Sequence, residues 1–164
     1  MASRLESAIL ALKAALEVNY ATTVYPPEVV QPTLFWPDPK VLDPSVKTLY
    51  LIRMREEAGG YGPSPCSVTE VLEVFILPAR RHPSPTENPF KEDPPRWKVS
   101  ADLVADVKEK IRRNPKLATE AEPTGTVIEA LDGPVVTDYE RWLPGWVIPE
   151  LRFTMRYRYE QSGR

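Results

Sequence analysis

Residues 151–159 alternate between apolar or aromatic side chains and polar or cationic ones. A period of two is the repeat of a β-strand, in which successive side chains point to opposite faces of a sheet. The apolar set is Leu151, Phe153, Met155, Tyr157 and Tyr159, with Arg152, Thr154, Arg156 and Arg158 between them. The pattern predicts a strand with one face in a core and one cationic face, so the chain must supply a layer to cover the first face.

Two segments have the helical repeat that such a layer needs. The first begins at Ser3, which has the capping-box spacing to Glu6, and is expected to end near Asn19. Its apolar stripe is Leu5, Ile9, Leu12 and Leu16. The second is expected to begin at Ser100 and to stop at Asn114–Pro115. Its stripe is Leu103, Val107 and Ile111, and its last turns carry Lys108, Lys110, Arg112 and Arg113, which suit the helix dipole.

Further strands are predicted where β-branched and aromatic residues gather. These are residues 47–55, followed by a break at Gly59–Gly60, residues 67–77, and a hairpin of 126–131 and 134–139 around Asp132–Gly133. The order is helix, strands, helix, strands. The sequence therefore predicts one α+β domain over residues 1–164, with a mixed or mainly antiparallel sheet packed against two amphipathic helices.

Proline is the compositional outlier, with 19 residues in 164. Many of them lie in residues 25–44 and 78–97, where their spacing excludes a helix and predicts long loops or edge strands. In the second segment Phe90 is the only large apolar side chain between Leu77 and Trp97. We therefore expect residues 78–97 to be an assembly arm that is flexible in the free protein and ordered by a neighbour.

The sequence offers little for catalysis. His82 is the only histidine and Cys66 the only cysteine, so neither a hydrolytic triad nor a zinc ligand set is expected. We expect His82 to be a solvated loop residue, and the acidic pairs Glu56–Glu57 and Glu92–Asp93 to be solvated as well. No catalytic residue, metal or cofactor is predicted. The net charge of −2 gives no general reason to bind nucleic acid, and no apolar run suggests a membrane partner.

Arginines and aromatic residues are the candidates for an interface. The last strand has an arginine face made of Arg152, Arg156 and Arg158. This face could bind phosphates, bind acidic side chains of a neighbouring subunit, or simply be solvated. Trp142 and Trp146 suit either an interface anchor or a cap on the core. The remaining candidates lie in or beside the proline-rich segment: Arg80, Arg81, Phe90, Arg96 and Trp97.

The pattern resembles the tail terminator, or tail completion, proteins of long-tailed bacteriophages. The segments that carry the resemblance are residues 5–16, 69–77, 103–111 and 151–159. The resemblance implies a ring, commonly a hexamer, which docks on the last ring of tail-tube subunits, stops polymerisation and offers a surface to the head connector. It also implies that DNA passes through the ring without sequence-specific binding. The protein would be assembled in the host cytoplasm and located in the virion, at the head-proximal end of the tail.

Two alternatives stay open at this stage. Within virion assembly, the chain could be a head-closure or neck protein, or a tail-tube subunit, which would polymerise alone where a terminator stops at a ring. The alternative from another class is a small ligand-binding or enzymatic α+β domain, which would need a pocket with converging polar groups.

Overall fold

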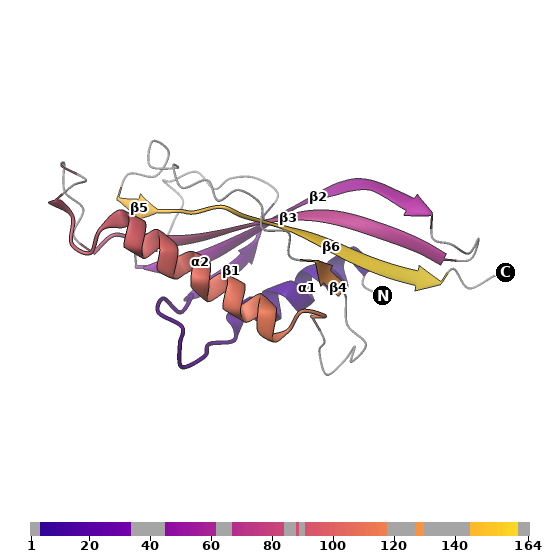
Figure 1. Ribbon diagram of the computed structural model, residues 1–164, viewed down its shortest axis with the longest axis horizontal. Helices are drawn as coiled ribbons and strands as arrows, with labels where there is room; N and C mark the ends of the chain where they lie inside the picture. Colours follow the sequence, from indigo (N-terminus) through magenta and orange to yellow (C-terminus); the bar gives the residue numbers. More distant parts are fainter. Residues whose placement is uncertain are drawn as a thin grey trace.

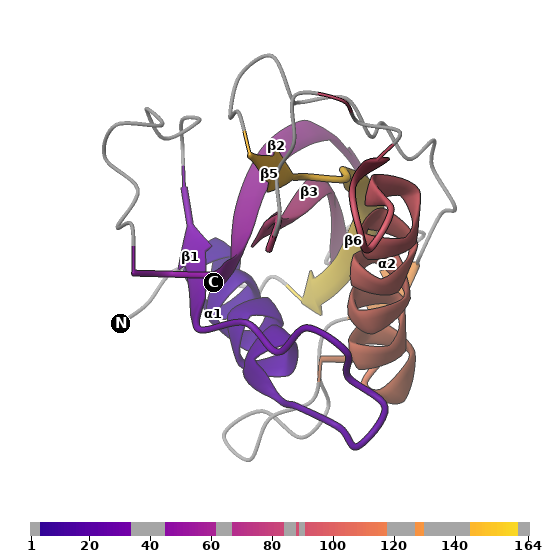
Figure 2. The same cartoon turned by 90° about the vertical axis from the view of Figure 1, so that its left-hand side faces the viewer.

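The computed structural model describes residues 4–33, 45–61, 67–83, 88, 91–117, 127–129 and 145–160. These residues form an α+β fold in which two helices pack on one face of a twisted mixed sheet (Figures 1 and 2). The elements are α1 (Arg4–Glu17), β1 (Val29–Pro32), β2 (Thr48–Tyr61), β3 (Ser67–Arg81), α2 (Arg96–Arg113), β4 (Val127–Glu129), β5 (Trp146–Val147) and β6 (Leu151–Glu160). The predicted fold class and the order of helices and strands are confirmed.

The strand order is β1-β2-β3-β6-β4, with β5 pairing the end of β3. Strand β1 is parallel to β2, and the other pairs are antiparallel. The predicted hairpin of residues 126–131 and 134–139 lies largely outside the described residues. Only β4 is described there, and it pairs with β6.

The apolar stripes of both helices face the sheet. Leu12 and Leu16 of α1 and Leu103, Val107 and Ile111 of α2 are buried against it. The main core joins them to alternate residues of the strands: Tyr50 and Ile52, then Leu72, Val74 and Ile76, then Leu151, Phe153 and Met155. The period-two pattern of β6 therefore predicted its core face correctly over 151–155. Side chains from residue 156 onward lie outside the described residues.

A second apolar cluster lies on the opposite face of the sheet, away from the helices. It contains Leu49, Leu51, Leu77, Ala79, Trp146 and Ile148. Because both faces are buried here, β2 and β3 read as nearly continuous apolar runs instead of alternating ones.

Strand β3 runs four residues farther than predicted, through Pro78 to Arg81. The register explains why proline fits. Residues 151 and 147 pair with 76 and 80 in a single register, which puts Pro78 opposite Pro149 in the gap between β5 and β6. The N–H that Pro78 lacks would point at Pro149, where β3 has no strand partner, so no ladder hydrogen bond is lost.

The predicted break at Gly59–Gly60 is wrong, because β2 continues to Tyr61. The register between β2 and β3 shifts by one residue between Glu57 and Gly60, which is a β-bulge. Glycine in a strand often marks a bulge, and here it changes the ladder without ending it.

Strands β2, β3 and β6 run past both helices at one end of the molecule (Figure 1). We call residues 54–61, 67–71 and 156–160 the extension, and the rest of the sheet with its two helices the helix-covered part. The extension is held by backbone pairing on both sides of β3.

Candidate functional site

Three of the predicted interface residues meet where β3 pairs with β5. The guanidinium of Arg81 stacks over the Trp146 ring at 5.0 Å from its centroid. Arg96, in the first turn of α2, donates to the Trp146 carbonyl at 3.3 Å. Trp146 is buried, with 6% of its surface exposed. Of the two roles considered for Trp146, the structure assigns it to the core, and the two arginines enclose it.

The predicted solvation of His82 and Glu92 is wrong, because both side chains are fully buried. His82 Nε2 lies 2.8 Å from the Pro94 carbonyl oxygen, so this nitrogen carries the proton and donates. Glu92 Oε2 accepts from Arg96 Nε at 2.6 Å and lies 3.8 Å from His82 Nε2. Burying a carboxylate requires such a partner, and Arg96 supplies it.

These contacts correct the boundaries of the expected arm. Residues 78–81 belong to β3, and Arg96 and Trp97 belong to α2, which begins four residues earlier than predicted. Pro95 is the N-cap, with φ −59° and ψ 142°, and its carbonyl accepts from the N–H groups of Lys98 and Val99. What remains of the arm is residues 83–91, whose two ends are tied together through His82 and Glu92. Phe90 lies outside the described residues.

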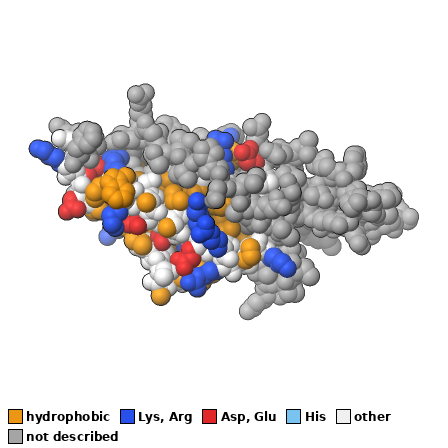
Figure 3. Space-filling model, in the orientation of Figure 1, with side chains coloured by type: hydrophobic (Ala, Val, Ile, Leu, Met, Phe, Trp, Pro, Cys, Tyr) orange, Lys and Arg blue, Asp and Glu red, His pale blue; other side chains and the backbone are white. Residues whose placement is uncertain are grey.

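Trp97 is the most exposed large aromatic side chain of the described residues, at 73%. It stands on the first turn of α2, next to Arg96 and the buried Glu92. Figure 3 shows hydrophobic side chains among lysines and arginines on the face that carries α2. An exposed tryptophan is the kind of residue that anchors protein interfaces. Trp142, the other interface candidate of this type, lies outside the described residues.

Arg80 and Arg152 have local roles on the two faces of the sheet. Arg80 donates to Thr48 Oγ1 at 2.7 Å and stacks over Tyr25 at 4.9 Å. Arg152 donates to Glu150 Oε1 at 3.0 Å and stacks over Phe75 at 5.3 Å, with 42% of its side chain exposed. Among the described side chains, Arg80 and Arg152 therefore lie on opposite faces of the sheet and do not share a patch. Arg156 and Arg158 lie in β6, and their side chains are outside the described residues.

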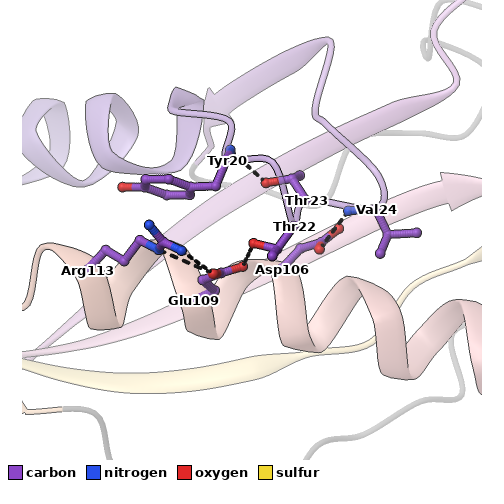
Figure 4. A network of polar contacts seen from close by, with 7 residues as sticks. All are labelled: Tyr20, Thr22, Thr23, Val24, Asp106, Glu109 and Arg113. Carbon is purple, nitrogen blue, oxygen red and sulfur yellow. Dashed lines mark hydrogen bonds and ion pairs between the residues drawn. The ribbon is translucent and has the colours of Figure 1, made fainter.

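A polar clamp that sequence reasoning missed joins α2 to the connection between α1 and β1 (Figure 4). Asp106 is 2% exposed and accepts the backbone N–H groups of Val24 at 2.9 Å and Tyr25 at 2.8 Å. One turn on, Glu109 accepts from Thr22 Oγ1 at 2.6 Å and from Arg113 at 2.8 Å. The Thr22 hydrogen bond and Arg113 hold the pKa of Glu109 below its usual range.

Lys110 completes the clamp from the same face of α2. Its ammonium donates to the Val18 carbonyl and, at 2.9 Å, to Asn19 Oδ1, so it meets the negative end of the α1 dipole. The side chain is fully buried, and burial lowers the pKa of Lys110, partly offset by Asp106. From the sequence, Lys110 is predicted only to interact favourably with the dipole of α2, like Arg112 and Arg113 in the same last turn. The overlooked signal is that Asp106 and Lys110 stand four residues apart on the apolar face.

Tyr50 lies beside the clamp on β2. Its hydroxyl donates to the Tyr25 carbonyl at 3.2 Å. Burial, and to a lesser extent the Asp106 carboxylate, raises the pKa of Tyr50 far above its ordinary value. The clamp thus fixes the path of residues 18–25 and, through it, the position of β1 at the edge of the sheet.

In the cluster around Trp146 and in the clamp, most polar side-chain atoms bind one another or backbone groups, whereas the buried Nε of Arg81 has no hydrogen-bond partner among the described residues. Within the part of the chain that the structure describes, no group of three or more His, Cys, Asp or Glu side chains could hold a metal ion. None of the described helices is long and apolar enough to cross a membrane.

Comparison with known proteins gives no match: no protein-family model fits the chain, and no curated protein sequence matches it.

Proposed function

We propose that this chain is a structural assembly protein that forms a ring on the end of a bacteriophage tail tube, stops the tube from growing and presents a docking surface to the head connector. The observation that carries the proposal is the extension. Strands β2 and β3 have 14 and 15 residues, against about five or six for an ordinary strand. Their far ends lie past both helices, where a single core does not require them (Figure 1).

Two other features support an assembly role. The residues that flank the segment 83–91 are buried and bonded: His82 donates to the Pro94 carbonyl, and Glu92 accepts from Arg96. Trp97 is exposed on the first turn of α2, next to Arg96. A heterologous contact repeated around an axis closes into a ring, and its two faces can then bind different partners.

Electron microscopy of the purified protein mixed with polymerised tail tubes tests the proposal. We expect a cap of discrete subunits at one end of each tube and no further growth when tube subunits are added. Open filaments of this protein alone would identify a tube subunit. Binding to the connector ring but not to the tubes would identify a head-closure or neck protein. Tubes that stay bare and keep growing would contradict the proposal.

A further inference from the structure

The outer edge of β2 is paired over only part of its length. Strand β1 matches Val29–Pro32 to Leu49–Ile52, and Thr33 N–H donates to the Ile52 carbonyl at 2.8 Å. From residue 54 to 61, no strand among the described residues pairs with β2 on the side away from β3. An edge strand with unpaired backbone groups is a template for another strand.

The hydrogen bonds show which backbone groups face this edge. The carbonyls of Thr48 and Ile52 accept from the β1 side, whereas the Lys47 carbonyl accepts from Arg81 of β3. Even-numbered residues of β2 therefore face outward, and the register with β3 is unbroken up to Glu57. It follows that the N–H and C=O groups of Met54 and Glu56 point away from β3. The bulge beyond Glu57 limits this regular stretch.

The same reasoning applies to β6 on the other side of β3. His82 N–H donates to the Gly145 carbonyl at 2.8 Å, in the register that β5 and β6 share against β3. Odd-numbered residues thus face β3, and even-numbered ones face outward. Strand β4 pairs with β6 only at residues 154–156. Beyond it, the backbone groups of Arg158 and Glu160 face an edge that has no strand partner among the described residues.

We propose that copies of this chain join through these two edges, the β2 edge of one copy pairing with the β6 edge of the next. The inference rests on the proposed ring. Both strands are antiparallel to β3, so they run in the same direction on opposite sides of the extension. Rotation about one axis brings β6 of one copy beside β2 of another as a parallel pair, and the contact repeats until the ring closes.

Proline substitution separates edge pairing from folding. Glu56→Pro removes an outward N–H and no hydrogen bond to β3, and Arg158→Pro does the same on β6. Glu56→Ala keeps the N–H and is the matched control. In sedimentation equilibrium over a range of concentrations, we expect wild type and Glu56→Ala to form complexes larger than two copies. Each proline variant should raise the dissociation constant at least about tenfold while melting close to wild type.

Several outcomes overturn the inference. These are a folded Glu56→Pro variant that assembles like wild type, a wild-type protein that stays monomeric at every concentration, and a complex that stops at two copies, which would indicate β2–β2 pairing. Arg55→Pro removes an N–H that faces β3, so this variant should melt at a lower temperature than wild type. That result would confirm that odd-numbered residues of β2 face β3. If wild-type protein forms rings that Glu56→Pro abolishes, but these rings do not cap tail tubes, this inference stands and the proposed function is overturned.

Discussion

The helix-covered part of the sheet and the extension differ in the interactions that the structure describes. In the helix-covered part, side chains of both helices and five strands fill one face. Charged side chains there also bind backbone groups: Asp106 accepts from Val24 and Tyr25, and Lys110 donates to Val18. In the extension, the strands are held by pairing to β3, with a bulge in β2 and two outer edges that no described strand covers.

This difference suggests that one part of the sheet stabilises the monomer and the other part contacts another chain. Buried apolar area and satisfied buried polar groups supply the stability of a domain, and the described ones lie in the helix-covered part. Backbone groups at an open edge add little to the monomer but offer directional contacts to another chain. We therefore expect substitutions in the first region to act on unfolding and those in the second to act on assembly.

The largest effect should come from the core face of β6. Phe153 is 4% exposed in the main cluster, so Phe153→Ala should lower the free energy of unfolding by roughly 3–5 kcal/mol. The neighbouring Arg152→Ala should cost about 0.5 kcal/mol, because that side chain is 42% exposed. Urea denaturation measures both. Comparable losses for the two variants would show that the arginine face of β6 is as tightly packed as the core face.

The clamp should come next. Asp106→Ala leaves the N–H groups of Val24 and Tyr25 buried without an acceptor, which should cost about 2–3 kcal/mol. The matched control is Asp102→Ala, four residues earlier on α2, where the carboxylate pairs only with the exposed Lys98. We expect that control to change stability by less than about 0.5 kcal/mol. Equal effects in a urea melt would mean that residues 18–25 do not depend on the clamp.

Local periodicity was sufficient where one face of an element is buried. The stripe of Leu12 and Leu16 in α1 and the alternation through Met155 in β6 predicted their core faces because each pattern repeats its own geometry. The fold class followed from these patterns. Where both faces are buried, as at Leu49 to Ile52, only residue composition indicated a strand.

The predictions that were wrong share a different cause. At each of them the outcome depends on a residue that is distant in the sequence but close in the fold. Pro78 stays in β3 because its missing N–H would meet Pro149, and Gly59–Gly60 stays in β2 because a bulge absorbs the extra residue. His82 and Glu92 are buried side by side, where His82 donates to the Pro94 carbonyl and Glu92 accepts from Arg96. None of these partners is visible in a local window, so the arm was predicted too long and the buried cluster was not predicted at all.

Alkaline pH gives a third, smaller effect within the clamp. The raised pKa of Tyr50 means that the unfolded chain releases this proton first, above about pH 10, so the folded state holds more protons there. Stability should therefore fall as pH rises above 10, by at most about 1.4 kcal/mol per pH unit from this group. Tyr50→Phe should flatten the decline between pH 10 and 11, measured by urea melts at each pH.

Lys110 offers a test of the direction of this pH dependence, because its contribution should have the opposite sign. Its lowered pKa means that the folded state releases the proton before the unfolded chain does, so its contribution to stability rises with pH below about 10.4. Lys110→Met should therefore make the alkaline decline steeper, opposite to Tyr50→Phe. Both variants shifting the profile in the same direction would contradict this assignment of the clamp.

The smallest effect on stability should come from the segment between the two buried ends of the arm. Replacing residues 84–90 with a Gly–Ser sequence of equal length keeps His82, Glu92 and Arg96, so the thermal midpoint should move by no more than a degree or two. Glu92→Ala is the contrasting variant. It leaves Arg96 without its 2.6 Å partner beside a buried histidine, and should cost about 1–3 kcal/mol. In the tail-tube assay we expect the Gly–Ser variant to show the large effect, because it should lose capping while remaining folded. A Gly–Ser variant that caps tubes like wild type would remove residues 84–90 from the assembly surface and leave the extension as its main element.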